Sequence, residues 1–314
     1  MSLSTDWPDI KFETWQDTCA GLHLWSQIVG KYRTRHTPWV NHSWHVTFYV
    51  TPRGLTTGPV PDGPGQITVD FDFRSHELIA ECSNGHRQTM TLEAMSVAEF
   101  LDGFKKAITS LGGDADIHGS PNEIPDAIPF AEDTQPRPYD HEAVERFHQA
   151  LILIDNAFNR FRSGFIGKVS PSHFFWGSFD LAVTRFSGRR APIHPGGVPA
   201  LPDDVAQEAY SDEVSSLGFW PGQGVGEAMF YSYAHPDPDG FKDQPVKPDA
   251  AYWSEELGEF LLPYEAVRTA HDPEVALMAF MQSTYEAAAN TADWDRDALE
   301  CEIGMPGKVR DFRS

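Results

Sequence analysis

Near its start the chain reads Ile28-Val29-Gly30-Lys31 and, after a loop, Trp44-His45-Val46-Thr47-Phe48-Tyr49-Val50-Thr51. The pattern returns as Phe165-Ile166-Gly167-Lys168 and, after a loop, Ser178-Phe179-Asp180-Leu181-Ala182-Val183-Thr184-Arg185. Each copy follows a helix-like stretch and precedes further strand-like ones, and both strands carry an apolar face and a polar face. This echo predicts an internal duplication that gives two similar lobes.

The stretches around the two copies predict the remaining elements of each half. Apolar spacing and turn signals give the first half a helix over 13–28 capped by Gly30, strands at 44–51, 66–73, 77–82 and 87–92, and a helix over 97–111. The second half repeats this plan with a helix over 141–163, strands at 178–185, 228–234 and 258–262, and a helix over 273–289.

These elements predict an α+β fold. Each half is a helix, a four-stranded antiparallel sheet and a second helix packed in two layers, a plan that resembles TATA-binding-protein-like or helix-grip topologies. A proline-rich connector at 121–140 separates an N-terminal lobe, 1–120, from a C-terminal lobe, 141–314. The second lobe carries a loop-rich insertion at 188–226, and loops of this length are usually functional or disordered.

The composition limits which partners and which cellular compartment we expect. The net charge of −22 repels phosphate backbones and anionic lipid, so we expect neither nucleic acid nor a membrane surface as a partner. Cys19, Cys82 and Cys301 have no paired spacing and indicate reduced thiols. Since no apolar segment has membrane-spanning or signal-peptide length, we expect a cytoplasmic protein, whose oligomeric state the sequence does not indicate.

Aligning the two copies predicts a catalytic pair. His45 and Asp180 lie on the polar strand faces, which would border a shared cleft if the lobes were related by a pseudo-twofold axis. A histidine oriented by a carboxylate is a common general base. His173 or His194 would assist it, with Ser178 or Tyr49 beside it. The alternative is a half-exposed sheet whose polar row faces solvent.

A basic cluster stands out in this acidic chain. Arg185, Arg189, Arg190 and His194 fall within one short segment with flanking glycines, and arginine forks match carboxylate and phosphate groups. The segment therefore predicts the binding of a small anionic molecule. Alternatively, the arginines pair with surplus acidic side chains. Trp176 upstream either walls the pocket or fills the core.

No motif assigns a cofactor. His42, His173 and His194 are candidate metal ligands, but there is no His-Glu-x-x-His motif and no paired-cysteine spacing, so we assign no metal. The glycine-rich segment 221–226 precedes a strand-like run and lacks the helix that a dinucleotide-binding loop requires. Asn122-Glu123 in the connector either lines an inter-lobe cleft or faces solvent.

A distinctive motif reads Ser170-Pro171-Ser172-His173-Phe174-Phe175-Trp176-Gly177-Ser178-Phe179-Asp180-Leu181-Ala182-Val183-Thr184-Arg185-Phe186-Ser187-Gly188-Arg189. Through it, and through 41–47, 121–125 and 283–289, the chain resembles an uncharacterised bacterial domain-of-unknown-function family. The resemblance covers nearly the whole chain. It implies no activity, cofactor or site residue.

The sequence leaves three functions open. The first is an enzyme acting on a small anionic metabolite in a cleft between the lobes, with His45 as acid and base, Asp180 as its orienter and the arginines holding the anion. The second is a protein that binds or sequesters such a molecule without catalysis. The third is a protein that binds a partner chain through the 188–226 loop.

Overall fold

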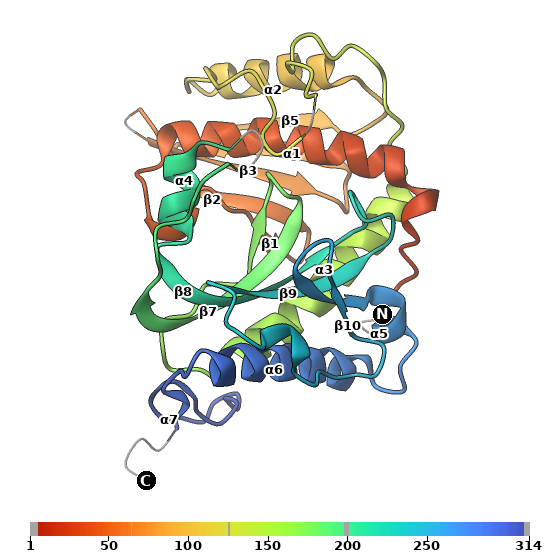
Figure 1. Cartoon of the computed structure of the whole chain (residues 1–314). Coiled ribbons are helices and arrows are strands. Elements are labelled where there is room, and N and C mark those ends of the chain that lie inside the picture. The colour runs from red at the N-terminus through yellow and green to blue at the C-terminus, as the bar shows by residue number, and fades with distance from the viewer. Residues whose placement is uncertain (1–5, 64, 125, 198–200, 311–314) are drawn as a thin grey trace.

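The computed structural model describes residues 6–63, 65–124, 126–197 and 201–310 and shows an α+β fold (Figure 1). Helix α2 (Val97–Ser110) lies at one end and α6 (Pro273–Thr291) at the other, with two antiparallel sheets between them. The expected α+β class is confirmed. An internal duplication is not confirmed, because the sheets have five and six strands and differ in plan.

A long helix and a five-stranded meander form the first half. Its elements are α1 (Gln16–His36), β1 (Tyr49–Thr51), β2 (Gly54–Asp62), β3 (Gly65–Asp72), β4 (Glu77–Cys82), β5 (Arg87–Thr91) and α2. The strands pair in chain order, and α1 packs against β2 and α2. Ser96 and Glu99 form a capping box that starts α2, because each side chain accepts a hydrogen bond from the other's backbone N–H.

The second half is a six-stranded sheet covered by helices on one face. Its elements are α3 (His141–Arg162), β6 (His173–Phe175), β7 (Asp180–Arg190), α4 (Asp203–Ala209), β8 (Asp212–Trp220), β9 (Met229–His235), β10 (Tyr252–Ser254), β11 (Glu259–Pro263), α5 (Tyr264–Arg268), α6 and α7 (Arg296–Leu299). The sheet order is β10-β11-β9-β8-β7-β6. Helices α3 and α6 pack against β7 and β8 respectively, and the intervening side chains, such as Leu181 and Leu217, are buried.

Phe48 and Phe174 join the two sheets at their edges. Their backbones exchange two hydrogen bonds, 2.9 and 2.8 Å long, so that the chain just before β1 pairs with β6. Helix α3 contacts both β1 and β7. Buried residues from both halves, among them Trp25, Phe104 and Phe158, belong to one hydrophobic cluster. The two halves therefore share a core.

Several expected boundaries are wrong. Helix α1 continues past Gly30 to His36. A glycine is needed at position 30, inside the helix, because the Trp176 indole occupies the space that a Cβ atom would fill. The expected insertion at 188–226 contains β8, an interior strand of the second sheet between β7 and β9. Only Tyr49–Thr51 of the expected strand 44–51 belongs to β1, because His42 and Ser43 turn the chain with φ of 58° and 57°.

Candidate functional site

A cavity of ≈ 300 Å³ lies on the face of the second sheet opposite helices α3 and α6. Side chains alternate along a strand, so the residues between the buried core positions point to this face. They form the floor of the cavity: His173 and Phe175 from β6, Asp180, Ala182 and Thr184 from β7, Ser216 and Trp220 from β8, Tyr231 and Tyr233 from β9, and Glu259 from β11.

Segments distant in sequence cover the cavity. Helix α4, which lies on the side of the sheet opposite α6 (Figure 1), is docked on the turn at Asn41–Ser43. The His42 N–H donates to the Glu208 carboxylate at 3.0 and 3.1 Å, and His42 Nδ1 donates to the Ala209 carbonyl at 2.9 Å. The connector adds Glu123. The roof therefore combines residues from the first half, the connector and the expected insertion.

Asp180 is the most deeply buried acid of the floor. Its residue is 3% exposed, and it accepts hydrogen bonds from the hydroxyls of Ser178 and Tyr231. Burial raises the pKa of Asp180, and the two hydroxyl donors oppose that effect. Gly218 lies opposite Tyr231 in the sheet, and a Cβ atom there would collide with the phenol group. Glycine at 218 thus allows Tyr231 to lie across β8 and reach Asp180.

Two glutamates complete an acidic group around the cavity. Burial, and then the negative charge of Asp180, raises the pKa of Glu259 to about 8, and its Oε2 has no hydrogen-bond partner among the described residues. The same two causes, opposed by Lys31, raise the pKa of Glu123 to about 7. Although Glu123 as a whole residue is exposed, its carboxylate packs closely against Gly177. A Cβ atom on residue 177 would collide with this carboxylate.

The connector is held in place by α1. Gln27 on α1 donates to the Asn122 carbonyl at 2.8 Å and accepts from the Asn122 N–H at 2.7 Å. Lys31, one turn further along the helix, donates to the Asn122 side chain. Glu123 then adopts a left-handed backbone with φ of 57°. These contacts place Glu123, but not Asn122, among the described residues that line the cavity.

Among the described hydrogen bonds, none joins His45 to Asp180. His45 is buried beside Trp39, with ring centroids 4.7 Å apart, and its Nδ1 accepts from the Val40 N–H at 3.2 Å. Burial lowers the pKa of His45, and the residue does not line the cavity. His173 does line it. Burial lowers the pKa of His173 to about 4, and its Nδ1 donates to the Pro171 carbonyl at 2.6 Å, which leaves Nε2 unprotonated.

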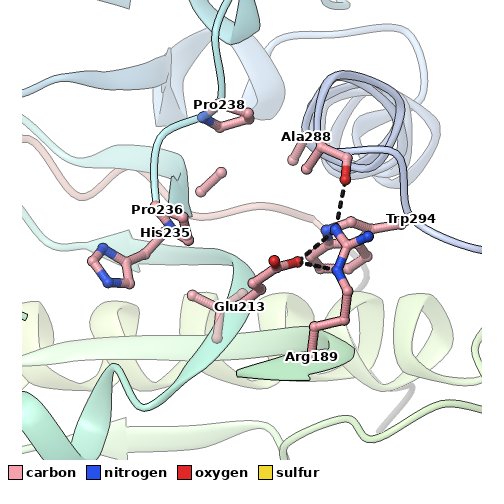
Figure 2. Close-up of a pocket in the computed structure, with 10 residues that line it drawn as sticks. Arg189, Glu213, His235, Pro236, Pro238, Ala288 and Trp294 are labelled. Atoms are coloured by element: carbon pink, nitrogen blue, oxygen red, sulfur yellow. Dashed lines mark hydrogen bonds and ion pairs between the residues drawn. The ribbon is translucent and has the colours of Figure 1, made fainter. Parts of the chain in front are cut away.

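The arginines expected to bind an anion lie elsewhere. Arg185 is buried on the helix face of the sheet, over the Phe161 ring at 3.5 Å, and donates to the Phe161 carbonyl. Arg189 is turned toward Glu213 (Figure 2) and binds it at 2.7 Å. The exposed Arg190 binds Asp212 at 3.1 Å. For Arg189 and Arg190 the structure matches the alternative that they pair with acidic side chains.

The other expected binding residues have structural contacts. Trp176 is buried, and its Nε1 donates to the Val46 carbonyl at 2.9 Å, so it fills the core. Tyr49 is half-buried on β1, with its ring 5.7 Å from the Arg33 guanidinium. The ring of His194 stacks on that of Tyr210 with centroids 5.0 Å apart. No group of three or more His, Cys, Asp or Glu side chains suited to a metal ion occurs in the described part of the chain.

Sequence reasoning missed Tyr231 and Glu259. Their strands enter the site only through the pairing of β9 with β8 and β11. Two weak signals were present. Tyr231 and Tyr233 alternate with smaller or apolar residues in Met229-Phe230-Tyr231-Ser232-Tyr233, and Glu259 is the only charged residue of an otherwise apolar strand.

Fold and site together define an α+β protein with a carboxyl-lined cavity on the free face of its second sheet. The chain belongs to a family of unknown function, DUF5996, whose family model matches residues 7–301, and the expected resemblance to such a family is confirmed. No curated protein and no solved structure matches it. Within the described ranges, none of the helices is both long and apolar enough to span a bilayer.

Proposed function

We propose that the protein binds a small organic molecule in the cavity over its second sheet, with Asp180, Glu259 and Glu123 holding the polar part of that molecule. One observation carries the proposal: acidic side chains line a partly open cavity, where burial raises their pKa values. Burying a carboxylate without a counter-charge is unfavourable, and such groups gather at functional sites more often than elsewhere. The volume is at the lower end of the range for ligand pockets.

Acid–base catalysis by these carboxyls is a second candidate. Glu123 and Glu259, with pKa values of about 7 and 8, would each exchange a proton readily near neutral pH. His173 has an unprotonated Nε2 and adds a possible proton acceptor. Catalysis would then rest on carboxyl groups and His173 rather than on the His45–Asp180 pair expected from the sequence.

A substitution that fills the cavity with a larger side chain tests whether the cavity is the binding site. Ala182 is buried in the floor, and Ala182→Phe would occupy the space that a ligand needs. A small-molecule fragment library would be screened by NMR against the wild-type protein, Ala182→Phe and the control Thr89→Phe, which adds the same ring to an exposed site on β5. We expect fragments that shift cavity resonances to bind the wild type and the control but not Ala182→Phe.

Fold retention is checked from the dispersion of amide resonances, and Thr184→Phe gives a second filled cavity if Ala182→Phe does not fold. Fragments that bind the filled and wild-type proteins equally would show that the cavity is not the site. A screen in which no fragment reaches the cavity at millimolar concentration would contradict the proposal as well.

A further inference from the structure

We infer that the ligand of this cavity is a small organic cation, a protonated or quaternary amine, seated between the carboxyl groups and a row of aromatic rings. The inference rests on the proposed function and adds the chemical class of the ligand. It reverses the charge expected from the sequence, where an arginine cluster indicated an anion.

The charge of the cavity lining favours a cation. Asp180, Glu259 and Glu123 line the cavity, whereas no Lys or Arg does so among the residues that the structure describes. His42 and His173 also line it, but burial lowers the pKa of both, so that neither supplies a positive charge at neutral pH. The described lining is therefore neutral or negative.

Two lysines that contact residues of the cavity lining already have partners. Lys168 lies beside the roof, where its Nζ is 2.7 Å from the Asp212 carboxylate and 4.4 Å from the centre of the Phe186 ring. Lys31 donates to Asn122 and faces Glu123 from α1. Glu123 thus has a partial counter-charge, but Asp180 and Glu259 are influenced by no cation identified among the described residues.

The cavity lining also contains an acceptor without a hydrogen-bond donor. Glu259 Oε2 is buried without a partner in the described structure, and a buried acceptor of this kind is costly unless a donor arrives. An anion would find no Lys or Arg in the described lining, and each carboxyl that ionises would repel it strongly in a medium of low dielectric constant. A cation that carries N–H or O–H groups can donate a hydrogen bond to Glu259, and the carboxyl groups do not repel it.

Aromatic rings form another part of the cavity lining. Trp220 stacks on Tyr231 with centroids 4.2 Å apart, Tyr231 lies 6.2 Å from Tyr233, and Tyr210 lies 6.2 Å from Tyr233. All four rings line the cavity. Aromatic faces attract ammonium groups, most strongly when water is excluded. Because the described residues form no metal-binding group, this chemistry favours an organic cation over a metal ion.

The experiment compares small molecules of similar size and shape that carry a positive charge, no charge or a negative charge. Choline, uncharged 3,3-dimethyl-1-butanol and anionic 3,3-dimethylbutyrate would be titrated by calorimetry into the wild type, Glu259→Gln and Glu256→Gln, together with a panel of small primary amines and their uncharged analogues. Glu256 is exposed on the turn before β11 and provides a control of equal charge change. We expect the cations to bind about tenfold more tightly than their uncharged partners.

Two further results are expected. At pH 9, where Glu259 is ionised, Glu259→Gln weakens cation binding about tenfold, and Glu256→Gln leaves it unchanged. Cation affinity rises between pH 6 and pH 9 as Glu123 ionises near pH 7 and Glu259 near pH 8, whereas affinity for the uncharged partner does not. Several primary amines are included because choline alone could be too large or the wrong shape for the cavity.

The outcomes separate the inference from the function on which it rests. Uncharged or anionic isosteres that bind as well as the cations would overturn the inference and leave the cavity as a binding site. The same holds if fragments enter the cavity but no ammonium compound does. If neither fragments nor any member of the panel enters the cavity, the proposed function and the inference both fail.

Discussion

Gly218 controls the position of Tyr231, and through it the environment of Asp180. A Cβ atom at 218 would collide with the phenol group, so Gly218→Ala should move the ring and remove one of the two hydroxyl donors to Asp180. We expect the free energy of unfolding to fall by about 1–3 kcal/mol from overpacking, and the affinity for a cavity ligand to fall about tenfold.

Urea denaturation and ligand titration measure these effects. Gly119→Ala is the control, since nothing lies within 4 Å of a Cβ atom there. Tyr231→Phe removes the hydroxyl while keeping the ring, and should reproduce the loss of affinity with less strain. An unchanged affinity in both Gly218→Ala and Tyr231→Phe would show that the hydroxyl does not support the site.

At the scale of single residues the sequence predicted the site in part. Asp180 and His173 were expected there and line the cavity, because strict alternation along β7 and β6 carries them to the free face. The expected partner His45 failed to reach Asp180 because two consecutive left-handed residues, His42 and Ser43, divert the chain before it. Left-handed backbone at residues other than glycine is rare and leaves little trace in a sequence.

At the scale of elements, α4 depends on the turn beneath it. A helix of seven residues is not stable alone, and the bonds from the His42 N–H to both Glu208 carboxylate oxygens attach it to the rest of the molecule. Glu208→Ala should therefore speed amide hydrogen exchange over 203–209 about tenfold, with little change in global stability.

Hydrogen-exchange mass spectrometry resolves this segment. Gln207→Ala, at an exposed site of the same helix, is the matched control and should leave exchange unchanged. Protection that is the same in Glu208→Ala and in the wild type would mean that α4 is held mainly by other contacts, such as those of the buried Ala206.

Elements differ in how far the sequence reveals them. Helices α2 and α3 were predicted within one or two residues, because each has a clear apolar stripe and a capping residue, Ser96 or Asp140. Strand β2 was missed because Gly58, Pro59 and Pro61 interrupt it, and its register shifts between Thr56 and Pro59. Strand β8 was missed because Ser215, Ser216 and Gly218 hide its alternation in a region rich in loop residues.

At the scale of the whole molecule the two halves cannot be separated without losing the site. The floor comes from the second sheet, whereas His42 and Glu123 come from the first half and the connector. Phe48 and Phe174 join the sheet edges, and one hydrophobic cluster runs through both halves. Sequence patterns predicted the layers of each half, but they carry no information on this edge-to-edge contact, which depends on a single backbone pair.

The acidic cavity also predicts how global stability depends on pH. The folded-state pKa of Glu259 is about 8, above its usual value of 4.5. The folded state therefore binds the proton more tightly than the unfolded state, and this contribution to stability is complete below about pH 4.5 and lost as the pH rises to 8. The loss is of the order of 4–5 kcal/mol, since the two pKa values differ by about 3.5 and one pKa unit corresponds to about 1.4 kcal/mol.

Glu259→Gln should remove most of this loss. Urea denaturation between pH 5 and pH 8 should show the variant close to the wild type at pH 5 and more stable than the wild type at pH 8. Because the net charge of −22 also destabilises the folded state as acids ionise, Glu256→Gln is needed to measure the effect of one surface charge. If both variants shift stability equally at pH 8, Glu259 ionises as freely as a surface acid, and the cavity lacks the uncompensated charge that would attract a cation.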